Sequence, residues 1–148
     1  MPLECWTQEQ FAEMSWHDNY VHALRIFQGE HGAGELVLDL DYILEWIKGA
    51  DGMRFRILPV NLRFIEVTAL RLSLDYASPS AAMGPFSMHA IERRAEARER
   101  YVAQLWKILV SWPVGEITFE ASGYEQRGWG KQVLSRLQHL LPEERVAA

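Results

Sequence analysis

The tetrapeptide WHDN at residues 16–19 places four side chains that can do chemistry next to one another. They are an indole, an imidazole, a carboxylate and an amide, and His22 follows shortly after. Imidazoles and carboxylates are common general bases and metal ligands. In an extended chain, however, His17 and His22 point to opposite faces, and only Asp18 shares a face with His22. We therefore expect no metal and no cofactor here, and we interpret Asp18 and Asn19 first as turn or capping residues.

A second candidate is the carboxylate pair Asp39 and Asp41, inside the alternating segment 34–47, GELVLDLDYILEWI. Successive side chains of a strand point to opposite faces, so the leucines at 36, 38 and 40 would face a core and the two aspartates would face outward. A slip by one residue would expose six large apolar side chains, each worth about 1.5 to 3 kcal/mol when buried. The pattern thus predicts a strand of fixed register with an acidic outer face.

The remaining candidates are Arg63, on the polar side of a long extended stretch, and Tyr124, in the segment ASGYEQRGW. That segment reads as a loop rich in hydrogen-bonding groups or as a simple strand-to-helix connection. No GxSxG, GxGxxG or P-loop motif occurs, and Cys5 lies in a terminal segment. We find no catalytic set, and predict ligand or partner binding by Trp16, His17, Asp18, Asn19, Asp39, Asp41, Arg63 and Tyr124.

Composition limits the class of protein. The 148 residues are 49% hydrophobic and 24% charged, which is typical of one globular domain, here residues 1–148. The single cysteine and the start MPLECW predict a cytoplasmic protein, and every apolar run is too short to span a membrane. The net charge of -5 argues against nucleic-acid binding. The run RRAEARER at 93–100 contains glutamates and is interpreted as solvated.

The elements that must position these residues are mainly strands. Thr7 and Gln10 have capping-box spacing and predict a short helix over 7–15. A strand over 19–28, with His22 on its apolar face, leads through the loop GEHGAG into the acidic strand. If Leu24 and Ile26 share the face of Leu38 and Leu40, then Val21, Ala23 and Arg25 lie with the aspartates. The extended stretch 55–76 is long enough that we expect a bulge near 66–69.

The second half of the chain is more ambiguous. ASPSAAMGP at 77–85 is a loop by composition. Residues 91–110 fit a helix, but the apparent hairpin turn WPVGE before the strand EITFEAS favours strands near 86–94 and 104–112. An apolar stripe over 130–141, stopped by Pro142, predicts an amphipathic C-terminal helix. The predicted class is α+β, with a twisted, mainly antiparallel sheet of about six strands that can curl toward a barrel.

Five segments resemble a group of small bacterial proteins whose function is not established. They are WHDNYVHALRI, GELVLDLDYILEW, FIEVTALRLSLDY, IERR and WPVGEITFEASGYEQ, and they span most of residues 16–126. The resemblance implies a strand over 106–112 and transfers no catalytic role.

These observations lead to two functional hypotheses and one simpler interpretation. The simpler one is a ladder of ion pairs on a solvated sheet face. The leading functional hypothesis is a non-enzymatic binding or accessory protein, of immunity type for example, that holds a protein partner on its acidic, tryptophan-containing face or adjoining loops. The alternative is an enzyme or small-ligand binder with a polar site around His17, Asp18, Asn19, Asp39 and Asp41.

Overall fold

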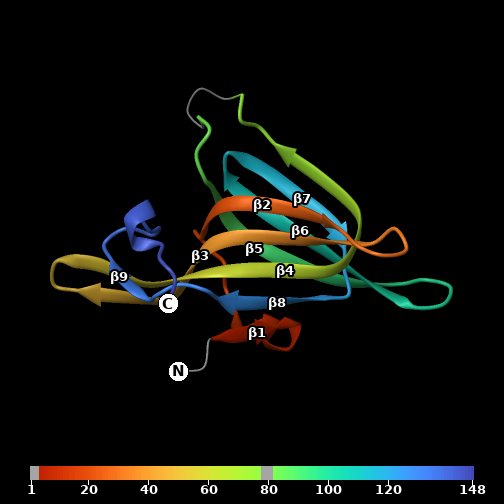
Figure 1. The fold of residues 1–148 in the computed structure, drawn as a ribbon, viewed down its shortest axis with the longest axis horizontal. Helices are drawn as coiled ribbons and strands as arrows, with labels where there is room; N and C mark the ends of the chain where they lie inside the picture. The colour runs from red at the N-terminus through yellow and green to blue at the C-terminus, as the bar shows by residue number, and fades with distance from the viewer. Residues whose placement is uncertain (1–3, 78–81) are drawn as a thin grey trace.

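β-Strands make up nearly all the regular structure in the computed structural model, which describes residues 4–77 and 82–148 (Figure 1). Two short 3-10 helices accompany the strands, η1 (Gln8–Glu13) and η2 (Pro142–Glu144). The strands are β1 (Cys5–Thr7), β2 (Tyr20–Gln28), β3 (Gly34–Gly49), β4 (Gly52–Leu74), β5 (Phe86–Ala97), β6 (Val102–Trp112), β7 (Val114–Glu120), β8 (Gly123–Gly128) and β9 (Val133–Ser135).

Six antiparallel strands close into a ring in the order β4, β3, β2, β5, β6 and β7, because β7 pairs with β4 again. The length of β4 makes this possible, since its last part pairs with β7 while its middle pairs with β8 and its first part with β9. β1 pairs with the outer edge of β8. The prediction of a mainly antiparallel sheet is confirmed.

A bulge in β4 lets this one strand serve two parts of the sheet. The register shifts between Thr68 and Arg71, and the backbone has positive φ at Glu66 (55°) and Ala69 (54°). Such left-handed positions cost an L-residue about 1 to 2 kcal/mol, and they bend the strand so that it reaches β7. The predicted bulge near 66–69 is confirmed.

The inner surface of the ring is the core. Leu36, Leu38 and Leu40 of β3 lie opposite Phe64, Leu62 and Val60 of β4, and all six are fully buried. An aromatic cluster continues this core, and its members contact one another mostly edge to face. It contains Phe11, Trp16, Phe64, Trp106, Phe119 and Tyr124.

The predicted pairing of the first hairpin is confirmed except at its start. Leu24 pairs with Leu38 and Ala23 with Asp39, as the alternation requires. A register shift between Val21 and Ala23 places Val21 opposite Leu40, in the core, where it is 1% exposed. The predictions that Val21 shares the face of the aspartates and that His22 lies on the apolar face are therefore wrong, because a bulge reverses the alternation here.

The helical half of the predicted α+β class is wrong, since the described residues contain only the two 3-10 turns. At the N-terminus the capping box forms, with the Gln10 side chain accepting from the Thr7 amide at 2.8 Å, but the turn that it starts is η1. In place of the C-terminal helix, β9 pairs with residues 55–57 of β4 and the chain continues without α-helix to η2. Pairing with a sheet edge outweighs the helical spacing of the leucines.

The other ambiguous segments resolve as strands. Residues 91–97 belong to β5 and residues 102–110 to β6, so the preferred interpretation is confirmed and the helix is excluded. The segment predicted as a loop at 121–129 contains β8. Part of the loop predicted at 77–85, residues 78–81, lies outside the described residues, as do residues 1–3. No helix in the described part of the chain is long and apolar enough to cross a membrane.

Candidate functional site

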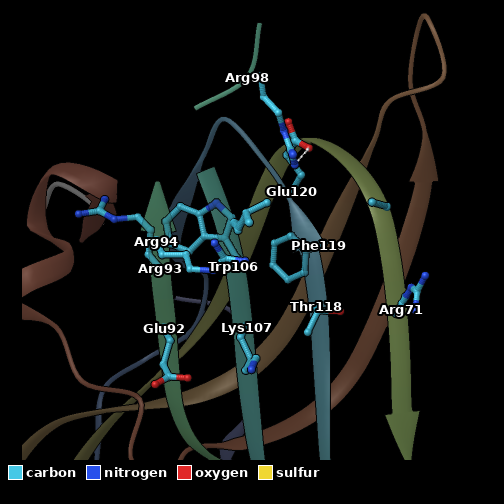
Figure 2. A pocket seen from close by; sticks show the side chains of 12 residues that line it. Arg71, Glu92, Arg93, Arg94, Arg98, Trp106, Lys107, Thr118, Phe119 and Glu120 are labelled. Carbon is cyan, nitrogen blue, oxygen red and sulfur yellow. Dashed lines mark ion pairs between the residues drawn. The ribbon is translucent and has the colours of Figure 1, made fainter. Parts of the chain in front are cut away.

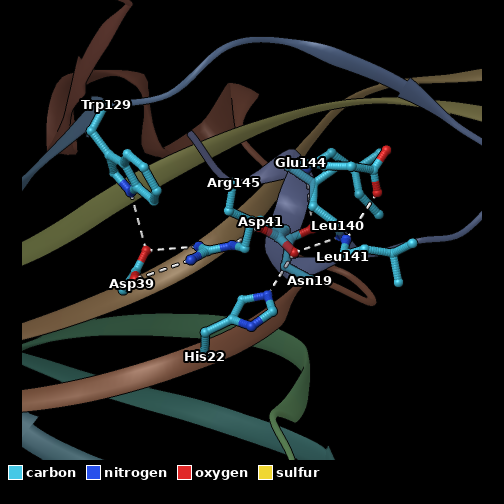
Figure 3. A network of polar contacts seen from close by, with 10 residues as sticks. Asn19, His22, Asp39, Asp41, Trp129, Leu140, Leu141, Glu144 and Arg145 are labelled. Carbon is cyan, nitrogen blue, oxygen red and sulfur yellow. Dashed lines mark hydrogen bonds and ion pairs between the residues drawn. The ribbon is translucent and has the colours of Figure 1, made fainter. Parts of the chain in front are cut away.

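A network of charged groups joins the outer face of β2 and β3 to the C-terminal segment, residues 129–148 (Figure 3). At its centre the Asp41 side chain is fully buried. One carboxylate oxygen accepts from His22 Nε2 at 2.7 Å and from the Leu140 amide at 2.8 Å. The other accepts from Arg145 Nε at 2.9 Å. Three donors from β2 and the C-terminal segment therefore satisfy this carboxylate.

Asp39, two residues earlier on the same face of β3, binds the other side of the same guanidinium. Arg145 Nη2 donates to Asp39 Oδ1 at 2.8 Å and Nη1 donates to Oδ2 at 3.3 Å. The Trp129 indole donates to Asp39 Oδ1 at 3.1 Å, and its ring lies 5.1 Å from the guanidinium carbon of Arg145. We call these residues the C-terminal clamp: His22, Asp39, Asp41, Trp129 and Arg145.

Two opposing effects set the pKa of Asp41. Burial raises the pKa, but the hydrogen bonds from His22, Leu140 and Arg145, together with the charge of His22, outweigh burial and hold the pKa below its ordinary value. The carboxylate therefore stays ionised at neutral pH, where it can hold the guanidinium.

The geometry of the clamp is that of a structural contact. A general base needs a lone pair within reach of a substrate, whereas Asp41 is enclosed and its oxygens are used by the chain itself. The predicted outward orientation of Asp39 and Asp41 is correct, but the partner that they contact is the C-terminal segment. A carboxylate pair that binds its own arginine fastens that segment to the sheet.

The candidates at residues 16–19 divide between core and surface. Trp16 is 3% exposed, and its indole donates to the buried Gln126 side chain at 2.8 Å. Asn19 is fully buried; its side-chain oxygen accepts from the Ile43 amide at 3.4 Å, and its Nδ2 has no partner among the described residues. The Asn19 amide also donates to the Trp16 carbonyl, which forms the expected turn. Both residues serve the fold.

His17 and Asp18 lie at the surface near the start of β2. The His17 ring is stacked 6.3 Å from Trp46 and lies edge-on to His89 at 5.5 Å. Asp18 has a positive φ of 62° and accepts from Gln138 Nε2 at 3.0 Å. Asp18 therefore contacts the C-terminal segment, whereas His17 contacts Trp46 and His89. Within residues 4–77 and 82–148, no cluster of three histidine, cysteine or acidic side chains can hold a metal ion.

Tyr124 faces the core instead of a loop surface. It is 2% exposed and its hydroxyl lies 2.9 Å from the sulfur of Met14. Burial, with a smaller contribution from nearby Tyr42, raises the pKa of its hydroxyl well above the ordinary value, so the group stays neutral. Its neighbours in the strand, Glu125 and Arg127, point the other way, to the outer face.

Arg63 lies in a groove on this outer face, and its neighbours come from four adjacent strands. The register places Arg25, Val37, Arg63 and Glu125 side by side across β2, β3, β4 and β8. The groove has a volume of about 560 Å³. We call it the outer groove; it is lined by Arg25, Phe27, Glu35, Val37, Asn61, Arg63, Glu125, Arg127, Gly128 and Trp129.

The outer groove combines an apolar centre with charged sides. Val37 is buried in its floor, Phe27 is 46% exposed, and Trp129 closes the end next to the clamp. Arg63 pairs with Glu35 at 2.6 Å and Arg127 with Glu125 at 3.1 Å. Among the described residues, Arg25 has no acidic side chain within ion-pair distance. The groove therefore offers apolar contact and one unmatched positive charge.

Sequence reasoning missed Arg145, Trp129 and Arg25 as site residues. Arg145 contacts Asp41 across 104 residues of sequence, and Trp129 contacts Asp39 across 90. No local pattern carries such a pairing. Only the position of Arg25 was indicated in advance, because the alternation predicted that it lies on the same face as Asp39. Neither a protein-family model nor a curated protein sequence matches this chain.

Proposed function

We propose that this chain is a non-enzymatic binding protein that holds a protein partner in the outer groove. The observation that carries the proposal is the arrangement of that groove, in which Val37, Phe27 and Trp129 are surrounded by paired and unpaired arginines. Protein interfaces combine an apolar centre with a polar rim, and tryptophan and arginine are their most frequent anchors. The outer groove has the same apolar centre and charged rim, in an area the size of one binding hot spot.

The charges indicate which side chain of the partner enters the groove. Glu35 and Glu125 are already matched by Arg63 and Arg127, whereas Arg25 has no carboxylate partner among the described residues. An acidic side chain flanked by apolar ones complements this pattern, because it pairs with Arg25 while its neighbours cover Phe27 and Val37. The partner proposed is therefore a protein with an acidic residue in an apolar segment.

The C-terminal clamp supports the same proposal by shaping the groove. Trp129 belongs to both, since its ring lies beside Arg145 and also lines the groove. Two carboxylates hold Arg145, and Arg145 together with Asp39 holds the indole. An aromatic side chain that is fixed before binding loses little conformational entropy when a partner packs on it.

Site-specific photo-crosslinking in the native host tests this function. A benzophenone amino acid at Phe27 is expected to crosslink one defined protein, because this position is half exposed within the groove. The matched control is the same amino acid at Val114, which is 79% exposed and lies outside the groove. The same crosslinked proteins at both positions, or none at Phe27, would contradict the proposal.

A further inference from the structure

A second groove lies on the outer face of β5, β6, β7 and the last part of β4 (Figure 2). Its volume is about 420 Å³, within the range of small-molecule sites. The register defines its floor, in which Glu92, Lys107, Thr118 and Arg71 lie side by side across the four strands. Arg94 and Glu120 belong to the next row. We call this the basic groove.

The basic groove is positive although the chain as a whole has a net charge of -5. Five basic residues and two glutamates line it, although the guanidinium of one of the five, Arg93, lies over the ring of Phe11 at 4.6 Å. One of these glutamates, Glu120, already accepts from the Tyr101 hydroxyl at 2.8 Å and lies 3.7 Å from Arg98. The other, Glu92, has no ion pair among the described residues, so the groove keeps a modest excess of positive charge. Clefts that concentrate one sign of charge attract ligands of the opposite sign.

Three donors are adjacent in the floor. Lys107 pairs across β6 and β7 with Thr118, and Thr118 pairs with Arg71 of β4. Cross-strand partners point to the same face of a sheet, so this register places the three side chains on one face. Lys107 lies 4.0 Å from Glu116, at the limit of an ion pair. In the part of the chain that the structure describes, Arg71 has no acidic side chain within that limit.

We propose that the basic groove binds a small anion with several oxygens, a phosphate or carboxylate group held between Lys107, Thr118 and Arg71. Neighbouring strands lie about 4.8 Å apart, so donors from three successive strands can surround one tetrahedral or planar oxyanion. Ammonium, hydroxyl and guanidinium groups all donate to such oxygens, and charge assistance strengthens these hydrogen bonds. Leu105, in the next row, gives an apolar contact for the rest of the ligand.

Glu92 lies opposite Lys107 in the same row and sets a limit on the ligand. It repels an anion that extends over β5, so the oxyanion is expected to lie toward β7 and β4. Replacing Glu92 by glutamine is therefore expected to strengthen binding about threefold. The same substitution at a glutamate outside the groove should leave binding unchanged if the site is defined. Equal strengthening by both variants would indicate a general attraction to a positive surface.

The test is titration of the ¹⁵N-labelled protein with sodium pyrophosphate and, separately, with sodium citrate, followed by amide chemical shifts. Saturable shifts at residues 71, 107 and 118 with either probe support the site, and the stronger probe distinguishes phosphate from carboxylate ligands. Arg71→Gln is expected to weaken binding at least tenfold. Arg71→Lys, which keeps the charge, tests whether the guanidinium itself is needed, and a thermal melt verifies that each variant is folded.

The matched control is Arg136→Gln, which removes one exposed arginine outside the groove. Non-saturable shifts with both probes, or equal weakening by Arg71→Gln and Arg136→Gln, would overturn the proposal. The outer groove does not share these residues, so failure here leaves the proposed function untouched.

Discussion

Replacing Arg145 by alanine is expected to release the C-terminal segment. The Arg145 side chain is 11% exposed, and it bridges Asp39, which is 17% exposed, and Asp41, which is fully buried. Removing one partner of a buried ion pair costs about 3 to 5 kcal/mol. Because His22 and the Leu140 amide still bind Asp41 in the variant, we expect the lower end, about 3 kcal/mol.

Two readouts measure this effect. The free energy of unfolding in urea, followed by tryptophan fluorescence, reports global stability, and the same loss lowers Tm by about 6 to 12 °C for a chain of this size. Hydrogen exchange of the Leu140 amide reports local release, because this amide donates to Asp41. A loss of about 3 kcal/mol speeds its exchange roughly a hundredfold.

The matched control is Arg56→Ala, which breaks an exposed ion pair of 3.4 Å with Glu45. Exposed pairs contribute about 0 to 1 kcal/mol, so this variant should stay close to wild type. The reasoning about the clamp is refuted if Arg145→Ala and Arg56→Ala have the same stability within about 0.5 kcal/mol and the Leu140 amide exchanges at its wild-type rate.

Three further predictions follow from single contacts. Because the pKa of Asp41 is lowered from its ordinary value of 3.8, its ionised form stabilises the fold at pH values above 3.8. This contribution is lost as the pH falls through the lower folded-state pKa. In urea unfolding, the free energy of unfolding should therefore fall less on acidification for Asp41→Asn than for wild type. Trp16→Phe removes the only partner of the buried Gln126 side chain in the described structure and should cost about 1 to 3 kcal/mol, much of which Trp16→Phe/Gln126→Leu recovers. Ala69→Gly should raise Tm because Ala69 has positive φ, whereas Ala95→Gly in regular β5 should lower it.

Alternation made the inner half of the fold predictable. Leu36, Leu38 and Leu40 face the core because a period of two over a long segment allows one register only. The bulge at residues 66–69 was also visible, since the alternation weakens there. A bulge of one residue at His22 was not, because nothing in the local sequence marks it, and it moved His22 from the core face to Asp41.

The C-terminal segment shows where local patterns fail. Leu134, Leu137 and Leu141 have helical spacing, yet each is between 42% and 55% exposed and β9 pairs with the edge of β4 instead. Its conformation depends on long-range contacts, namely β9 with residues 55–57 and Arg145 with Asp41. The same contacts determine which parts of the acidic face the C-terminal segment covers. The sequence therefore predicts the face on which the candidate site lies, but not which of its residues remain accessible.

The most direct test of the central proposal is the affinity of the crosslinked partner for groove variants, measured by calorimetry. Phe27→Ala and Arg25→Glu are expected to weaken binding at least tenfold, because they remove the apolar contact and reverse the unmatched charge of the outer groove. Val114→Ala should bind like wild type. Affinities of Phe27→Ala and Arg25→Glu within twofold of wild type would contradict the account.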